Sequence, residues 1–240
     1  VGSEMCIRDR TDSTPDPAMI DMFNAMVDEM FDYGRFILKS KRQNPSEDLL
    51  SAIANAKIGD EKLTDEFLDG SWLLIIFAGN DTTRNTMSGG IKLLHENQSQ
   101  KDLLMNNLDL LPNFINETVR CVSPVIHMRR TSLEEAEING QKIGPYEKIS
   151  LWYGAANRDP DIFENPDEFN ILRENADKHL AFGIGRHTCL GKPVALMQLK
   201  EFYSQFLTRF KDFEMNGDWK VAPNNFVHAI QEMPIKFTPE

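Results

Sequence analysis

The sequence predicts a mainly helical protein with a minor antiparallel β part. Apolar residues recur at helical spacing over residues 17–42, and a long apolar helix is indicated from Thr64 onward. Short strand-like segments are confined to residues 125–153 and to the tail. Of the 240 residues, 41% are hydrophobic and 26% are charged, which excludes a disordered or collagen-like chain.

The first expected helix covers residues 17–42, and Asn44 with the following proline ends it. A shorter helix is expected at residues 47–56, with Ser46 as its N-cap. The preceding residues 1–10 follow no periodic pattern. We therefore expect them to be a non-native or unstructured leader, and residues 11–240 to form the functional domain.

The next helix combines a capped start with a fully apolar centre. Thr64 is positioned to cap it, and the two acids that follow suit the positive end of the helix dipole. Residues 72–77 are apolar on every face, which predicts a helix that runs through the interior.

Unfavourable residues follow directly in this helix. Gly79 costs about 1 kcal/mol relative to Ala in a helix, and Asp81 is expensive in a core unless it is paired or faces water. Such residues in a buried helix indicate a site. The alternative is an early helix end, with Asp81 and Thr82 capping a new helix; the apolar pattern that continues to Leu94 argues against it.

The remaining chain alternates between helix, strand and loop. Turn residues at Asn139-Gly140 and Gly144-Pro145 separate the expected strands. The expected elements are a helix at 111–121, strands at 125–128, 137–143 and 148–153, a loop at 157–180, a helix at 192–210, and hairpin and strand at 219–227 and 234–237.

Charge and cysteine content exclude several classes of function. A net charge of −11 argues against nucleic acid as a partner, since phosphate binding needs clustered basic residues. The longest apolar run is far shorter than the ~20 residues of a membrane span. Cys6, Cys121 and Cys189 are too widely spaced for a disulfide framework or a zinc site. We therefore expect a reducing, cytoplasmic location.

The strongest chemical pattern is the glycine-rich segment 182–191, which contains Cys189 just before a predicted helix. Glycines let the backbone approach a flat, bulky group closely, and a helix N-terminus favours a thiolate. One thiolate suffices as an axial ligand to haem iron. Pro193 and Thr188 break the phosphate-loop and dinucleotide patterns. A cysteine nucleophile with His187 as base remains open, although two residues apart is poor geometry.

This segment and three others resemble motifs of the cytochrome P450 family, and the four occur in the family's order. FGIGRHTCLG is similar to the family's cysteine loop, and AGNDTT at 78–83 to its oxygen-activating helix segment. Glu117 and Arg120 match its E-x-x-R pair, and Arg173 sits where the family completes that network. The resemblance starts near residue 15 and corresponds to the C-terminal portion of the P450 fold, so we expect the N-terminal part to be missing. By contrast, His95-Glu96 does not complete an H-E-x-x-H zinc motif, because Ser99 stands in the fifth position.

The resemblance implies roles residue by residue. Cys189 would be the proximal thiolate and Phe182 would pack beside it, while Asp81 and Thr82 would supply protons to dioxygen. Arg130 and His187 match positions that pair with haem propionates, with a structural or solvent role as the alternative. The other cofactor-binding positions are Ala78, Gly79, Gly183, Gly185 and Gly191, and the structural network is Glu117, Arg120 and Arg173.

The implied function is that of a bacterial-type haem-thiolate monooxygenase. Residues 79–90, 127–131 and 151–153 are similar to P450s that hydroxylate terminal methyl groups of alkanes and fatty acids. Sterol side-chain or terpenoid hydroxylation, and a non-catalytic truncated remnant, are the alternatives. The implied cofactor is haem b, with electrons from NAD(P)H through a ferredoxin and a ferredoxin reductase. The expected partners are an apolar small molecule and no nucleic acid, and the protein is expected to be a monomer.

Overall fold

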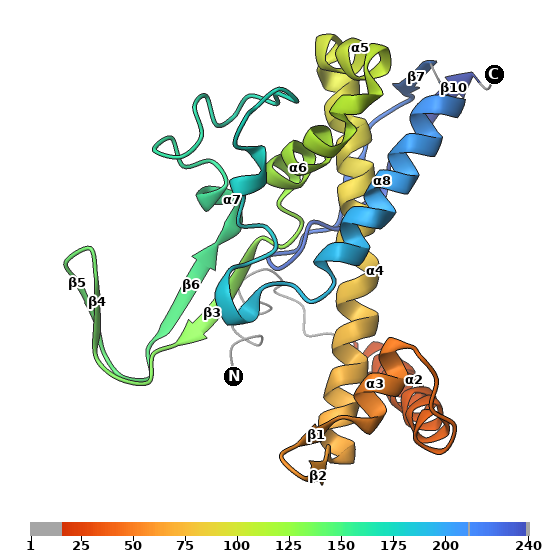
Figure 1. Ribbon diagram of the computed structural model, residues 1–240, viewed down its shortest axis with the longest axis vertical. Coiled ribbons are helices and arrows are strands. Elements are labelled where there is room, and N and C mark those ends of the chain that lie inside the picture. Colours follow the sequence, from red (N-terminus) through yellow and green to blue (C-terminus); the bar gives the residue numbers. More distant parts are fainter. Residues whose placement is uncertain (1–15, 211, 239–240) are drawn as a thin grey trace. The chain divides into compact units, whose positions relative to one another are not determined.

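The computed structural model describes residues 16–210 and 212–238, which fall into two compact units (Figure 1). The first unit extends to Gly79 and the second begins at Asn80. Helix α4 (Asp65–Glu96) is continuous across this boundary. The leader predicted at residues 1–10 lies outside the described residues.

In the first unit, α2 (Pro17–Gln43) and α3 (Leu49–Asn55) pack with the first turns of α4. Two two-residue strands, β1 (Lys57–Ile58) and β2 (Glu61–Lys62), form an antiparallel pair before α4. The buried centre consists of Leu38, Ala54, Leu68 and Trp72. The Trp72 indole donates a hydrogen bond to the Met30 carbonyl oxygen at 3.0 Å.

The ends of these helices agree with the sequence prediction, except at the start of α3. The predicted helix over 17–42 is confirmed, and Asn44 is its C-cap. Ser46 was expected to cap α3, but Asp48 is the N-cap and accepts a hydrogen bond from the Ser51 N–H at 2.8 Å. The Ser46 hydroxyl instead donates to the Asp48 carboxylate at 2.6 Å, so it orients the cap.

The expectation that residues 72–77 run through the interior is wrong for most of that segment. Trp72 is buried at 5% exposure, whereas Leu74 is 66% and Phe77 is 54% exposed. Within the first unit, α2 and α3 cover only the side of α4 that carries Leu68 and Trp72. The alternative of an early helix end is also wrong, because α4 continues through Asp81 to Glu96.

The second unit is built on the remainder of α4 and two helices that pack with it. The predicted helices are confirmed as α6 (Leu111–Val122) and α8 (Lys192–Arg209). Sequence periodicity missed α5 (Gln98–Asn106) and the short turn η1 (Leu108–Leu110). The core of this unit is Ile91, Leu94, Leu104, Leu111, Phe114, Ile115, Val119, Phe169, Ile171, Leu199, Tyr203, Leu207 and Phe213.

The strands of the second unit form antiparallel pairs, as expected for a minor β part. Strand β3 pairs with β6 in a ribbon that leads to the β4–β5 hairpin (Figure 1). The other two pairs are β7 with β10 and β8 with β9. The strand bounds are His127–Thr131 for β3, Ala136–Ile138 for β4, Gln141–Ile143 for β5, Lys148–Trp152 for β6, Asp212–Met215 for β7, Lys220–Val221 for β8, Ile230–Glu232 for β9 and Ile235–Thr238 for β10.

The strand predicted at residues 125–128 is displaced. Val125 forms only an isolated bridge to Val227, and the paired strand β3 starts at His127. The segment 157–180 is mostly irregular, as predicted. It contains the turn η2 (Ala176–Lys178), and the short helix α7 (Tyr153–Ala156) precedes it. Over the described ranges, no helix has both the length and the hydropathy needed to cross a bilayer.

Candidate functional site

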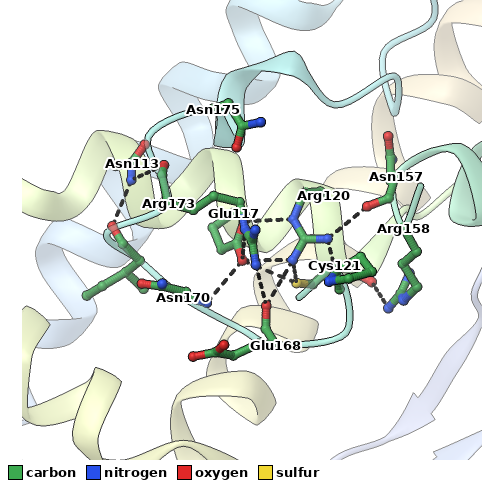
Figure 2. Close-up of polar contacts among 12 residues, drawn as sticks. Asn113, Glu117, Arg120, Cys121, Asn157, Arg158, Glu168, Asn170, Arg173 and Asn175 are labelled. Atoms are coloured by element: carbon green, nitrogen blue, oxygen red, sulfur yellow. Dashed lines mark hydrogen bonds and ion pairs between the residues drawn. The ribbon is translucent and has the colours of Figure 1, made fainter. Parts of the chain in front are cut away.

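A buried ion network in the second unit contacts the irregular segment 157–180 (Figure 2). The Arg120 guanidinium binds both carboxylate oxygens of Glu117, each at 2.8 Å. Arg173 donates its Nε to the same carboxylate at 3.1 Å. Glu117 and Arg120 are fully buried and Arg173 is 8% exposed. The structure thus brings together the three residues that were expected to form a structural network.

Main-chain carbonyls satisfy the other donors of the two arginines. Arg120 lies within 3.0 Å of three such oxygens, and Arg173 within 3.1 Å of three. Because buried charges are tolerated only when they are paired and hydrogen-bonded, this arrangement compensates the excess positive charge. The acceptors are Asn157 O, Pro166 O and Glu168 O for Arg120, and Glu164 O, Asn165 O and Glu168 O for Arg173.

Asn157 extends this network toward the cysteine loop. It is fully buried, and its main-chain oxygen accepts from Arg120. Its side-chain oxygen accepts from the Leu180 N–H at 2.6 Å, and its amide donates to the Ser123 hydroxyl at 2.8 Å. Sequence reasoning missed Asn157, because a lone asparagine in a loop gives no periodic signal.

The cysteine loop folds back on itself through main-chain hydrogen bonds. The Cys189 N–H donates to the Phe182 carbonyl and the Gly183 N–H to the Leu180 carbonyl, both at 2.8 Å. Gly183 has a φ of +70°, and a Cβ there would lie 3.1 Å from the His187 carbonyl oxygen. This turn therefore requires glycine, as the sequence predicted for a close backbone loop.

The two described cysteines have opposite environments. Cys189 is exposed and lies three residues before the first residue of α8, where the positive end of the helix dipole favours an anion. Cys121 lies beside the ion network. Burial first, and then the Glu117 charge, raise the pKa of the Cys121 thiol to about 11. The two cysteines thus differ in exposure, and Cys121 remains a neutral thiol.

His179 supports the start of the cysteine loop as a neutral side chain. Burial, and then the charge of Lys192, lower the pKa of His179 to about 4. Its unprotonated Nδ1 accepts a hydrogen bond from the Ala181 N–H at 3.3 Å. The imidazole and the Phe182 ring lie 5.6 Å apart between centroids. His179 therefore helps to hold Phe182 in place.

The α4 segment and the cysteine loop meet at one small cavity of about 20 Å³. Thr82 on α4 and Phe182 on the loop both line it, so two predicted site residues share a surface. A space of this size is close to that of one water molecule. The other lining residues are Thr83, Thr86, Val119, Pro124, Ala181, Ala195 and Leu199.

Asp81 lies one residue earlier on α4 and is half-buried. Its carboxylate accepts a hydrogen bond from the Arg84 guanidinium at 2.5 Å, and the Asp81 side chain is 30% exposed. The predicted proton donor is therefore held in an ion pair on the same helix. An i, i+3 pair of this kind is partly open to solvent, so water can reach the carboxylate.

The other predicted cofactor-binding residues lie on β3, in the cysteine loop itself and on α4. Arg130 lies on β3 and donates to the Arg129 carbonyl at 2.8 Å. His187 is exposed in the turn η3 (Gly185–His187). Ala78 and Gly79 belong to the first unit and precede Asp81 directly on α4.

The donor set fits a haem group rather than a protein-only metal centre. Within residues 16–210 and 212–238, no three His, Cys, Asp or Glu side chains are grouped to hold a metal ion. Haem supplies its own equatorial nitrogen atoms and needs one axial protein ligand. Cys189 is an exposed thiol on the loop that turns tightly at Gly183, as such a ligand role requires.

Comparisons with known proteins identify the family of the chain. A family model described as Cytochrome P450 matches residues 14–238. The chain is 35% identical over 216 residues to cytochrome P450-terp of Pseudomonas sp., covering 90% of this chain and 50% of that protein. It is 36% identical over 211 residues to a steroid C26-monooxygenase of Mycobacterium tuberculosis, covering 87% and 56%. The crystal structure of cytochrome P450-153 from Novosphingobium aromaticivorans superposes with a TM-score of 0.84 at 33% identity, covering 93% and 55%.

The helical fold and the cysteine loop are those of the haem-thiolate class of proteins. The chain belongs to the cytochrome P450 family. Membership implies a haem iron with a cysteine thiolate ligand. The chain spans about half the length of the curated relatives that it matches.

Proposed function

We propose that this chain belongs to a monooxygenase that places one oxygen atom from O2 into a C–H bond of an apolar substrate. The other oxygen atom leaves as water, with two electrons from NAD(P)H delivered through a ferredoxin and its reductase. The observation that carries the proposal is the exposed Cys189 on a glycine loop whose Phe182 shares a cavity with Thr82. When bound, the haem supplies the oxygen-activating chemistry.

The residues of this chain would then bind the cofactor and handle protons. Cys189 provides the thiolate, and Phe182 shields it. Asp81 is close to solvent beside Arg84, and Thr82 faces the cavity, so the two residues link water to the site. Arg130 and His187 would bind the propionates, since both carry donors suited to a carboxylate.

For the substrate, we propose terminal hydroxylation of an alkane or a fatty acid. The support is the resemblance over residues 79–90, 127–131 and 151–153. Attack on a methyl group requires a narrow apolar channel that keeps the neighbouring methylene away. Ile75, Ala78 and Gly79 on α4 are candidates for its wall. The relative named steroid C26-monooxygenase favours a steroid as the second candidate.

The first experiment tests the haem site in the chain itself. The chain is loaded with haem, reduced and treated with CO, and its Soret band is recorded. We expect the red-shifted Soret band of a thiolate-ligated, CO-bound haem in the parent and in Cys121→Ala, but not in Cys189→Ala. A band that survives in Cys189→Ala would contradict the ligand assignment, and its absence from every protein would favour the truncated remnant.

The second experiment tests the substrate by offering octane, a fatty acid and a steroid to the complete protein with its redox partners. Terminal alcohols from the first two substrates would support the proposal. In-chain alcohols, or turnover of the steroid alone, would contradict the terminal-methyl assignment but not the monooxygenase assignment.

A further inference from the structure

Asn85 is a buried amide one turn after Asp81 that joins two distant parts of the second unit. It is 1% exposed. Its Nδ2 donates to the main-chain oxygen of Asp81 at 2.8 Å. Its Oδ1 accepts from the Ile230 N–H at 2.9 Å. Both polar atoms of the amide are therefore used, one on α4 and one on β9.

The bond from Asn85 adds a side-chain donor to a main-chain carbonyl of α4. In an α-helix the same carbonyl already accepts the N–H of the residue four positions later. A side-chain donor to a helical carbonyl often bends a helix slightly and holds that carbonyl in place. Thr86 repeats the arrangement, since its hydroxyl donates to the Thr82 carbonyl at 2.8 Å. The carbonyls of Asp81 and Thr82 are thus both held by side chains.

The bond to Ile230 fixes the segment that leads into β9. The same segment is held against the chain before β3 by two main-chain bonds, from Ile126 N–H to Phe226 O at 2.8 Å and from His228 N–H to Pro124 O at 2.9 Å. Residues 226–230 therefore contact α4 through Asn85 and contact the start of the β3 ribbon through their backbone.

We propose that Asn85 is a positioning residue that locks the main chain of Asp81 and Thr82 to the segment 226–230. The inference rests on the proposed function, which gives Asp81 and Thr82 their role with protons. Because the described side-chain bond joins Asn85 to the helical turn of Asp81 and Thr82 at the Asp81 carbonyl, Asn85 acts through that turn and is not a catalytic residue. Its two bonds make the orientation of the turn depend on a segment almost 150 residues later in the sequence.

The test compares two variants of Asn85 with a matched asparagine. Asn85→Ala loses both bonds, whereas Asn85→Asp retains an acceptor for Ile230 but loses the donor to Asp81. Asn113→Ala is the control, since Asn113 donates to Ile171 O and Arg173 O within 3.1 Å and these described bonds reach neither segment. Hydrogen–deuterium exchange of the 240-residue chain is followed in peptides covering residues 78–90 and 222–234.

We expect Asn85→Ala to raise exchange about tenfold in both peptides, and Asn85→Asp to raise it only in residues 78–90. Asn113→Ala should leave both peptides unchanged. A second readout is the C–O stretching band of the haem-loaded, reduced and CO-treated chain, which reports the polar groups around the bound gas. Asn85→Ala should shift or broaden this band, and Asn113→Ala should not.

Unchanged exchange in both peptides of Asn85→Ala would overturn the inference. Faster exchange with an unmoved C–O band would also overturn it, because Asn85 would then be only a structural residue. If the CO-treated parent chain gives no red-shifted Soret band, the proposed function fails. The exchange pattern then decides by itself whether Asn85 locks the two segments.

Discussion

The hydroxyl of Tyr203 occupies the space in which a side chain at Gly90 would lie. A Cβ on Gly90 would be 2.0 Å from the Tyr203 oxygen and 2.9 Å from Thr118 Cγ2. That hydroxyl donates to the main-chain oxygens of Thr86 and Met87 at 2.9 and 3.1 Å. Gly90 therefore sets how closely α8, which follows the cysteine loop, approaches α4.

Gly90→Ala is expected to destabilise the second unit, because the rigid, fully buried Tyr203 must move. The expected loss is about 1–3 kcal/mol in the free energy of unfolding, measured by urea denaturation. Gly154→Ala is the control, since a Cβ at Gly154 would meet no atom within 4 Å. Equal denaturation midpoints for the two variants would contradict the close approach at Gly90.

Removing Arg173 should be among the most damaging single changes in the chain. Arg173→Ala leaves the buried Glu117 with one partner fewer and leaves several main-chain carbonyls without their donor. We therefore expect the free energy of unfolding to fall by about 3–5 kcal/mol. Urea denaturation measures it. The exposed Lys220–Glu232 pair, at 2.8 Å, provides the contrast, and Lys220→Ala should leave the midpoint almost unchanged. A small effect of Arg173→Ala would show that the network is not an integral part of the fold.

His179 should make stability fall as the pH is lowered. Its pKa is about 4 in the folded chain against an ordinary value near 6.5, because it is buried beside Lys192. Between these values the unfolded chain binds more protons, so stability is retained above pH ~6.5 and is lost progressively toward pH ~4. The loss attributable to His179 is up to about 3 kcal/mol.

His179→Asn checks this pH dependence, since an amide oxygen can accept the Ala181 N–H without titrating. Denaturant unfolding of the parent and the variant is measured from pH 4 to pH 8. The difference in stability between them should shrink, or reverse in favour of the variant, as the pH falls. Parallel curves over this range would contradict the assignment.

The two described cysteines should differ in reactivity. With a pKa of about 11, Cys121 is about one part in a thousand thiolate at pH 8, and its sulfur is half-buried. We expect iodoacetamide to modify the exposed Cys189 more than ~100-fold faster than Cys121 in the folded chain. Mass spectrometry of peptides resolves the sites. In urea the two rates should converge; similar rates in the folded chain would contradict the different environments.

Local sequence patterns predicted much of the secondary structure and the segments that carry the cysteine loop and the ion network. α2, α6 and α8 follow their apolar periodicity, and the cysteine loop and the ion network match the family's pattern. The strand β3 was placed too early, because Val125 is apolar but forms only a bridge. The polar α5 was missed, because its two central leucines give little periodicity.

The parts that the sequence could not predict depend on contacts between distant residues. Residues 72–77 are apolar on all sides, but burial depends on what covers them, and α2 and α3 cover one side only. Asn85 is one polar residue in a helix, and its partner Ile230 is 145 positions away. No local pattern reports such a pairing, so only the structure reveals it.

The way in which Arg120 and Arg173 hold the irregular segment has a consequence for how this region can evolve. Both guanidinium groups bind its main-chain oxygens, which every amino acid possesses. Apart from buried side chains such as Asn157 and Phe163, side chains between residues 157 and 168 can therefore be exchanged without loss of the loop's path. Insertions or deletions would misplace the carbonyls and would be selected against. We therefore expect the exposed side chains of this segment to vary during evolution while its length stays constant.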